Sequence, residues 1–543
     1  MMSLWVCVAL LGVLGSATGH AGHECPEIHN ANGRLTKEDI DMCCTKLNYW
    51  KRECAKPPKV NFPPEVVKYW ESLETAVTHE EKEENASKHN RTKRQTATGR
   101  RDDTTINPPL YWQSRPIPPR PLPRKEYRLL SPAEKWRFHR ALHAMKVTMV
   151  PNTEFSEYDI FTAYHQATEA PGAHFGPAFL PWHREFIKRF ETAMQRHEPG
   201  VTLPYWDPTM DDGMPRPQDT IMWTPEYMGN GFGYVTSGPA ANWNTPFPVA
   251  NRTRLYRNLT AGVLEGRVPL LPNDLEMGFL YAGGRGLRDL SFYVDPSLEF
   301  VHGRVHDWIG GHMGDLENAP ADPVFYMYHA YLDCWWDDYR QKQRSLGINP
   351  ETDYPEDAEA QGVGGTTPLP EWPIPTRVED SVHLPNKMMR PFRIRNIDGL
   401  SDDYTRLYYS CSPRPVCPSC NNSPILFCDN AQNIPKCRTK LQLNTNCTAY
   451  KDLNPCHQGE CCAIGVGDQY MCRSSCSSFG PVRPIHQLPQ QPQVQGPQQT
   501  GFDGRLHRGP NDQLPPQYVP NQIPNSVNIP TGSNPAIKRP TSV

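Results

Sequence analysis

The sequence predicts a mainly α-helical protein: a four-helix bundle with long loops, then a small disulfide-rich module and a disordered tail. Between residues 127 and 410, long runs without helix breakers carry apolar side chains at helical spacing. Eleven cysteines crowd into residues 411–476, which is typical of disulfide-braced modules in exported proteins. Residues 477–543 are rich in proline and glutamine and have too few apolar side chains to offset the entropy of ordering.

Composition narrows the possible partners. The net charge of the 543 residues is −3, so bulk charge does not predict binding to nucleic acid. No apolar run beyond the N-terminus is long enough to cross a bilayer, and we therefore expect no association with a membrane.

The N-terminal region predicts export. Leu4 to Leu14 form an apolar run too short to span a bilayer, and small residues follow, which predicts a signal peptide over residues 1–19. Residues 20–78 form a cysteine-bearing segment that we expect to pack as a cap, and residues 79–126 form a charged, Pro-rich linker. The protein is therefore expected outside the cell.

Two kinds of sequence pattern predict covalent processing of an exported chain, namely proteolytic cleavage and glycosylation. Residues 91–94 read RTKR and resemble a proprotein-convertase site, which suggests cleavage after Arg94, although a solvated charge run has the same composition. Short sequons that predict glycosylation weakly stand at Asn85, Asn90, Asn251, Asn258, Asn421 and Asn446.

The helical domain is expected to begin near residue 127. Ser131, Pro132 and Glu134 provide a cap, a proline at the first helical position and an acidic first turn. The helix that follows carries His139 and His143 one turn apart, but no third candidate ligand lies in it. We interpret this pair as ordinary helix residues.

Two sets of three histidines mark a candidate metal site. His302 and His306 are spaced i,i+4, so both project from one face of a predicted helix, and His329 lies on the next helix. Asp322 and Pro323 are expected to start that helix. The second set has two members on predicted helices and one on the loop between them: His165, His174 and His183. A helix bundle can point such side chains inward onto metal.

Local patterns predict the secondary structure of three further stretches. We expect a helix over Tyr158 to Thr168, long surface loops over residues 207–290, and strand and loop over residues 390–410. In the cysteine-rich module, Cys417 and Cys420 have the CxxC spacing of a zinc site, but no second such pair follows, which favours disulfides. Cys334 stands alone in the sequence.

The chemistry of the six imidazoles favours a borderline transition metal. With no thiolate or carboxylate in the sets, copper, zinc and nickel all suit them. On spacing alone, zinc-dependent hydrolysis is an alternative, but such sites usually include a carboxylate ligand or base, whereas the surroundings here are aromatic.

The segments HFGPAFLPWHREF, LPYWDP, HGRVHDWIGG and DPVFYMYHAYLD resemble the copper-A and copper-B signatures of the tyrosinase family. These type-3 dicopper proteins include tyrosinases, catechol oxidases and molluscan haemocyanins, and the resemblance covers roughly residues 127–410. It implies two copper ions that use O2 to oxidise phenols or catechols to ortho-quinones. The implied ligands are His165, His174 and His183 for copper A, and His302, His306 and His329 for copper B.

Three further residues have expected roles, two of which the resemblance implies. Glu299 matches the position at which some members hold a water that can deprotonate a phenol, and Phe325 resembles the aromatic gate over copper A. Asp333 is expected to accept a ligand N–H or to pair with Arg184. Each residue also has a purely structural interpretation: Glu299 as a helix-face carboxylate, Phe325 as a core phenylalanine and Asp333 as a surface acid.

Three departures from the family pattern concern the substrate. Tyr328 stands where many relatives have a second histidine. Gly303 occupies the position of an asparagine that is associated with strong monophenol hydroxylation. No cysteine lies between His165 and His174, so the Cys–His thioether of some relatives cannot form there. Whether monophenols are oxidised as well as diphenols stays open.

The whole pattern resembles the secreted shell-matrix tyrosinases of molluscs. It predicts an exported copper phenoloxidase whose quinones pigment or cross-link an extracellular matrix. Its substrates would be small phenols and catechols, or Tyr and DOPA side chains of matrix proteins. The alternatives are a non-catalytic matrix protein with a vestigial copper site and a haemocyanin-like O2 binder.

Overall fold

The computed structural model describes residues 37–74, 121–259, 271–292, 295–355, 382–431, 434–465 and 467–478. The expected signal peptide, the part of the linker that holds Arg94 and the C-terminal tail lie outside these ranges. Within the ranges, no helix has the length and apolar character that a bilayer crossing requires.

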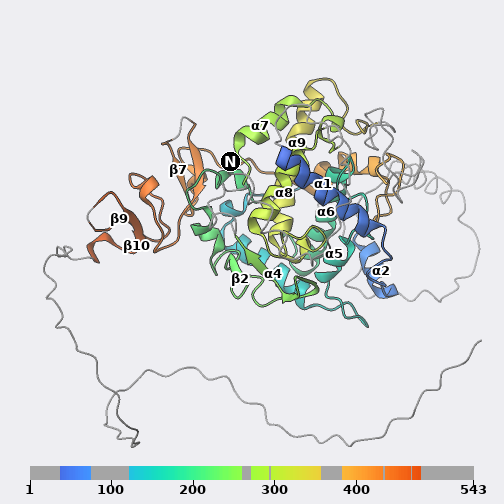
Figure 1. Ribbon diagram of the computed structural model, residues 1–543, viewed down its shortest axis with the longest axis horizontal. Helices are drawn as coiled ribbons and strands as arrows, with labels where there is room; N and C mark the ends of the chain where they lie inside the picture. The colour runs from blue at the N-terminus through green and yellow to red at the C-terminus, as the bar shows by residue number, and fades with distance from the viewer. Residues whose placement is uncertain are drawn as a thin grey trace, which may run out of the picture. The chain divides into compact units, whose positions relative to one another are not determined.

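The protein is mainly helical, as the sequence predicts (Figure 1). The α-helices of the described ranges are α1 (Lys37–Cys54), α2 (Pro64–Ser72), α4 (Pro132–Val147), α5 (Asp159–Tyr164), α6 (Phe179–His197), α7 (Asp274–Gly283), α8 (Ser297–Ile309) and α9 (Val324–Ser345).

The strands of the described ranges are short and pair two by two. The parallel pair is β1 (Leu122–Arg124) with β6 (Tyr409–Cys411). The antiparallel pairs are β2 (Phe232–Tyr234) with β5 (Tyr256–Asn258), β3 (Asn244–Val249) with β4 (Arg252–Arg254), β7 (Leu426–Asp429) with β8 (Lys436–Thr439), and β9 (Glu460–Ala463) with β10 (Tyr470–Arg473).

Helix α4 starts where the sequence predicts. The Ser131 hydroxyl accepts the N–H of Glu134 at 3.3 Å, and the Glu134 carboxylate accepts the N–H of Ser131 at 2.8 Å, which completes a capping box. On the same helix His139 hydrogen-bonds the Tyr127 hydroxyl at 2.8 Å and His143 is exposed, so the pair is made of ordinary helix residues, as predicted.

The core of the helical body is aromatic. Helix α6 packs against both α4 and α9, and its apolar side chains Phe186, Phe190 and Met194 are fully buried. The ring of Phe190 stacks on that of Tyr326 in α9 with centroids 3.5 Å apart. This packing fixes the two helices that carry His183 and His329.

Helix α5 is shorter than predicted and ends at Tyr164, so His165 is its C-terminal cap rather than an interior residue. The side chain of Gln166 donates to the Thr162 carbonyl at 3.2 Å. A side chain thereby takes the acceptor that the next helical N–H would use, and the helix stops.

The prediction of surface loops over residues 207–290 is wrong in two respects. Met222, Trp223 and Met228 are buried, and α7 forms inside this stretch. Asn273 starts α7 with a capping box, accepting the N–H of Glu276 at 2.8 Å, which is a local pattern present in the sequence.

A buried carboxylate ties the helices to the first strand pair. Asp333 of α9 accepts from Arg184 Nε at 2.6 Å and from Arg124 Nη1 at 2.8 Å, and the Tyr409 hydroxyl also donates to it. The predicted pairing with Arg184 is confirmed, and the interpretation of Asp333 as a surface acid is wrong because the residue is buried.

The disulfides settle how the cysteines are used. Cys334 of α9 bonds to Cys411 of β6, so Cys411 is joined to the helical body, although we expected the module to begin there. The further disulfides of the described ranges are Cys417–Cys428, Cys420–Cys437, Cys447–Cys461, Cys456–Cys472 and Cys462–Cys476. Because Cys417 and Cys420 are both consumed, the zinc alternative is wrong.

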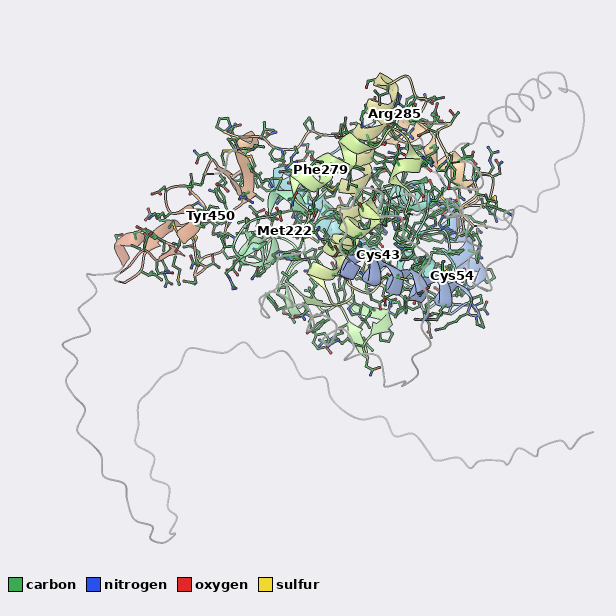
Figure 2. All side chains as sticks on the ribbon, turned by 45° about the horizontal axis from the view of Figure 1, so that its top comes forward. Cys43, Cys54, Met222, Phe279, Arg285 and Tyr450 are labelled. Carbon is green, nitrogen blue, oxygen red and sulfur yellow. A yellow bond between two sulfur atoms is a disulfide. The ribbon has the colours of Figure 1, made fainter. Side chains whose placement is uncertain are left out.

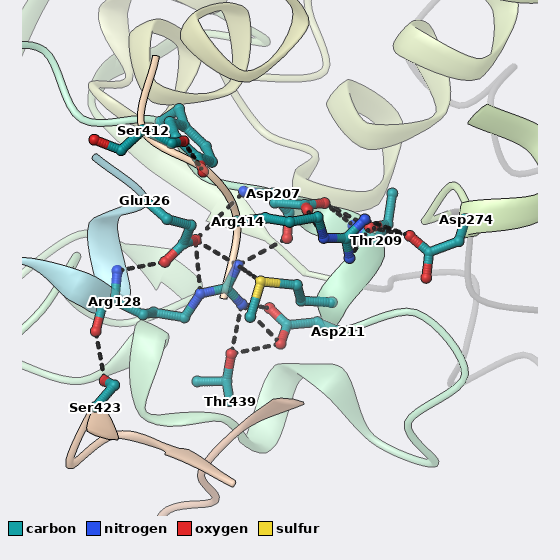
Figure 3. A network of polar contacts seen from close by, with 12 residues as sticks. Glu126, Arg128, Asp207, Thr209, Asp211, Asp274, Ser412, Arg414, Ser423 and Thr439 are labelled. Carbon is teal, nitrogen blue, oxygen red and sulfur yellow. Dashed lines mark hydrogen bonds and ion pairs between the residues drawn. The ribbon is translucent and has the colours of Figure 1, made fainter. Parts of the chain in front are cut away.

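A buried polar network joins the cysteine-rich module to the helical body (Figure 3). The Arg128 guanidinium donates to Glu126, to both carboxylate oxygens of Asp211 and, at 2.6 Å, to the Thr439 hydroxyl of β8. The Ser423 hydroxyl donates to the Arg128 carbonyl at 2.6 Å. One arginine therefore contacts two segments of the module.

Candidate metal centre

The first triad comprises His165 after α5, His174 on the following loop and His183 in α6. Nε2 of His174 lies 3.4 Å from Nε2 of His165. One nitrogen from each residue lies within 4.8 Å of the other two, so the three imidazoles can hold one ion.

The second triad comprises His302 and His306 of α8 and His329 of α9. Nε2 of His302 lies 2.8 Å from Nε2 of His306 and 3.1 Å from Nε2 of His329. Asp322 and Pro323 directly precede α9 as predicted, and the Asp322 carboxylate accepts the N–H of Val324, the first residue of the helix, at 3.0 Å.

The two triads face each other. The rings of His183 and His329 stack with centroids 4.2 Å apart and planes 15° apart, and the His183 and His302 centroids are 6.4 Å apart. The Phe179 ring lies between the triads, 4.9 Å from His183 and 5.0 Å from His302. The six imidazoles therefore form one centre.

Backbone carbonyls hold the far side of several rings. Nδ1 of His165 hydrogen-bonds the Glu317 carbonyl at 3.1 Å, and Nδ1 of His306 hydrogen-bonds the Met313 carbonyl at 2.9 Å. Nδ1 of His183 does the same with the Phe179 carbonyl at 2.9 Å. A neutral imidazole that donates through Nδ1 presents the lone pair of Nε2 to the centre.

Burial keeps these imidazoles neutral. It lowers the pKa of His165 to about 4 and that of His306 to about 3, and it holds the pKa values of the other triad members well below their usual range. The neutral form is the one that binds a metal ion, so the centre needs no deprotonation near neutral pH.

The residues present fit a pair of copper ions. Three neutral imidazoles per ion, without carboxylate or thiolate, suit copper. Nε2 of His183 is buried and has no hydrogen-bond partner within the described ranges. An unpaired buried polar atom costs about 1–3 kcal/mol, and a bound metal ion would remove this cost.

Glu299 of α8 is buried and contacts the loop that carries His174. Its two carboxylate oxygens accept the N–H groups of Phe175 at 2.7 Å and Gly176 at 3.1 Å. Burial raises the pKa of Glu299 to about 8, and the two backbone N–H groups act against this rise. Glu299 also lines the cavity at the centre, so it is more than a helix-face carboxylate.

Phe325 packs between the triads. Its ring centroid lies 4.1 Å from that of His329 and 5.3 Å from that of His165, and the residue is fully buried. The expected role of Phe325 as a gate over copper A stays a prediction. Tyr328, which departs from the family pattern, stacks on His302 with planes 6° apart.

A cavity leads to the centre. It ends on His174, His302 and His306, and within the described ranges its aromatic lining comprises Phe175, Phe292 and Phe300. Mainly apolar clefts with a few polar groups are typical of small-molecule sites. Cys43 and Lys46 of α1 complete one wall of this cavity, and α1 lies against α8 (Figures 1 and 2).

Sequence reasoning missed the contribution of α1. The segment was expected only as a cap, yet Trp50 packs against His174 and Tyr49 donates to the Glu317 carboxylate. The first contact joins residues that are 124 positions apart in the sequence, and the second joins residues that are 268 positions apart. No local sequence pattern predicts either contact.

The comparisons with known proteins agree with this centre. Residues 155–342 match the family model described as the common central domain of tyrosinase. A tyrosinase-like protein of Caenorhabditis elegans is 35% identical over 348 residues, covering 62% of this chain and 46% of that protein. A tyrosinase-like protein of the mollusc Pinctada maxima is 33% identical over 320 residues, covering 56% of this chain and 65% of that protein.

The tyrosinase of Streptomyces antibioticus is 35% identical over 255 residues, covering 42% of this chain and 86% of that enzyme. A helical body with two facing histidine triads defines a protein of the type-3 dicopper class. The chain belongs to the tyrosinase family. It spans less than two thirds of the length of the animal tyrosinase-like relatives named above.

Proposed function

We propose that this protein is a secreted copper phenoloxidase that uses O2 to oxidise phenols and catechols to ortho-quinones. In this proposal His165, His174 and His183 hold copper A, and the other triad holds copper B. The proposal rests on two observations: the two buried triads face one another, and His174 of the first triad lines the same cavity as His302 and His306 of the second.

The chain's own residues bind and orient the substrate. When bound, the copper pair supplies the redox chemistry, so that electrons leave the diphenol and dioxygen is reduced to water. Phe175, Phe292 and Phe300 offer ring surfaces to a phenol. Each carboxylate oxygen of Glu299 keeps a lone pair beyond its backbone bond, and we assign to Glu299 the holding of a water that can deprotonate a phenol.

We propose an extracellular setting, in which the quinones pigment or cross-link a matrix by reaction with matrix proteins. The expected signal peptide, the disulfides and the similarity to a molluscan tyrosinase-like protein support it. We also propose a catalytic domain over residues 127–410 and a cysteine-rich module over residues 411–476, with Phe325 as the aromatic gate over copper A.

The proposal is tested by His302→Ala with His143→Ala as a matched control, because His143 is exposed on α4 and outside both triads. The full chain is loaded with copper, and oxidation of a catechol and of its monophenol is followed side by side. We expect His302→Ala to abolish catechol oxidation and His143→Ala to match wild type. Full turnover in His302→Ala would contradict the proposal.

Two alternatives give different results in the same experiment. Reversible O2 binding by the copper-loaded protein without catechol turnover would favour an O2 carrier. Fewer than two coppers per chain after loading would favour a matrix protein with a vestigial site. The monophenol arm decides whether hydroxylation accompanies diphenol oxidation.

A further inference from the structure

The N-terminal segment, residues 37–73, contains α1 and α2 and lies outside residues 155–342 of the family match. We infer that α1 contributes to the copper-A site. In this inference Trp50 is a positioning residue for His174, and Tyr49 is a positioning residue for His165. This inference rests on the proposed copper centre and assigns a further role within it.

Trp50 supports the loop that carries His174. Its side chain is only 2% exposed, and its ring meets the His174 ring edge to face at 4.7 Å and 81°. The indole N–H donates to the Pro171 carbonyl at 3.2 Å, and the His165 ring lies 6.3 Å away. Because Pro171 precedes His174 in the same loop, one side chain restrains both the ring and its backbone.

Tyr49 and Lys59 support His165 through Glu317. The Glu317 carboxylate is 1% exposed and accepts from the Tyr49 hydroxyl at 2.9 Å, from Lys59 Nζ at 2.5 Å and from the Ala167 N–H at 3.1 Å. The carbonyl of the same residue holds Nδ1 of His165. A buried carboxylate needs such partners to stay in place, so the N-terminal segment fixes the group that orients this imidazole.

The contact of α1 with the copper-B helix is of a weaker kind. Lys46 Nζ pairs with Asp307 of α8 at 2.7 Å, and the two side chains are 34% and 24% exposed. Partly exposed ion pairs of this type contribute little energy. The support that α1 provides is therefore concentrated at copper A.

Groups that orient ligands typically change metal affinity by roughly ten- to a hundredfold when they are removed. We therefore expect the loss of Trp50 to weaken copper A by this factor while copper B keeps its affinity. A residue that only stabilised the fold would affect both ions alike.

The chain offers a matched control in Trp70 of α2. Trp70 is also 2% exposed, and its indole N–H also donates to a proline carbonyl, that of Pro391 at 3.4 Å. Its ring partners are Phe161, Tyr164, Phe186 and Phe392, none of which belongs to a triad. Trp50→Leu and Trp70→Leu thus remove equivalent side chains, only one of which touches copper-A imidazoles.

The test measures copper per folded full-length chain after loading and gel filtration against a competing chelator. Wild type and Trp70→Leu are expected to keep both ions, and Trp50→Leu about one, in accord with the affinity loss above. In a His302→Ala background Trp50→Leu should remove the remaining copper, whereas in a His165→Ala background it should change nothing. Trp50→Phe should restore most of the copper, because an aromatic ring again faces His174.

Equal copper loss in Trp50→Leu and Trp70→Leu, or a further loss in the His165→Ala background, would overturn the inference. Wild-type protein that binds no copper would overturn the proposed function itself, which separates the two failures. If the leucine variants do not fold, Tyr49→Phe replaces them, with Tyr404→Phe as its control. Tyr404 donates to the buried Glu185 carboxylate at 2.7 Å and so loses an equivalent bond, and equal copper content in these two variants would also overturn the inference.

Discussion

The Glu299 carboxylate holds a loop in a conformation that one of the loop's residues disfavours. Phe175 has a φ of +63°, in the left-handed region, which costs a bulky residue roughly 1–2 kcal/mol. Glu299 offsets this strain by accepting the N–H groups of Phe175 and Gly176. Because His174 immediately precedes Phe175, the strained turn sets the direction of a candidate copper ligand.

Glu299→Ala is expected to lower the free energy of unfolding of the metal-free protein by about 2–3 kcal/mol, because two buried N–H groups lose their acceptor. Urea unfolding of copper-free protein measures this without a contribution from metal. Glu134→Ala, which removes the α4 capping-box carboxylate at an exposed site, should cost about 1 kcal/mol. Equal effects of the two variants would show that the loop does not depend on Glu299.

His139 makes stability depend on pH. Burial, and then the charge of Lys135, lower its pKa to about 4, below the value of about 6.5 expected in an unfolded chain. The folded state therefore binds fewer protons than the unfolded state between these pKa values. The stability contributed by His139 is complete above about pH 6.5 and is lost as pH falls toward about 4.

Between about pH 7.5 and 5.5, this one group should remove about 1 kcal/mol from the free energy of unfolding, after allowance for its partial exposure. His139→Gln should lose that part of the pH dependence. The triad histidines are common to wild type and His139→Gln and cancel in the comparison. Identical pH dependence in wild type and His139→Gln would refute the assignment.

At the scale of elements, the sequence predicted what local patterns encode. Ser131 caps α4, Asp322 and Pro323 directly precede α9 as expected, and the i,i+4 spacing of His302 and His306 places both rings in one triad. The end of α5 was not predictable in this way, because it depends on where the Gln166 side chain finds an acceptor. The role of Trp50 depends on its contact with a loop 121 residues further along the chain, and no periodic pattern in the sequence predicts such a contact.

The Cys334–Cys411 disulfide joins α9, which carries His329, to the strand pair that closes the helical body. Its loop spans 77 residues, whereas the Cys417–Cys428 loop within the module spans 11. In the chain-entropy model a longer loop removes more freedom from the unfolded chain. The body therefore depends on this single bond more than the module depends on any one of its own.

Replacing both Cys334 and Cys411 by alanine should lower the free energy of unfolding by about 4 kcal/mol, against about 3 kcal/mol for the Cys417 and Cys428 pair. Paired replacement leaves no free thiol to form a wrong bond. Denaturant unfolding of the two double variants measures the difference. A larger loss for the Cys417 and Cys428 pair would mean that loop length does not govern these bonds.

At the scale of the whole molecule, a buried charge network at Arg128 joins the helical body to the cysteine-rich module (Figure 3). It lies beside buried apolar clusters, one of which holds Met210 of the body with Leu426 of the module. The Arg128 side chain is fully buried, as are its carboxylate partners Glu126 and Asp211. The network reaches Thr439 of the module, whose hydroxyl also donates to Asp211 at 2.5 Å. Removing the arginine would leave two buried carboxylates without their cation.

Arg128→Met should therefore lower the free energy of unfolding by roughly 3–5 kcal/mol, the range for breaking a buried ion pair by deleting one partner. Arg140→Met is the matched control, because Arg140 pairs with Glu198 at 2.6 Å on the surface and should cost less than about 1 kcal/mol. Limited proteolysis of Arg128→Met should release the module at lower urea than in wild type, because the Thr439 hydroxyl loses its bond from Arg128 and its other partner, Asp211, is left without a cation. If Arg128→Met matched Arg140→Met in both measurements, the module would be held by contacts other than this network.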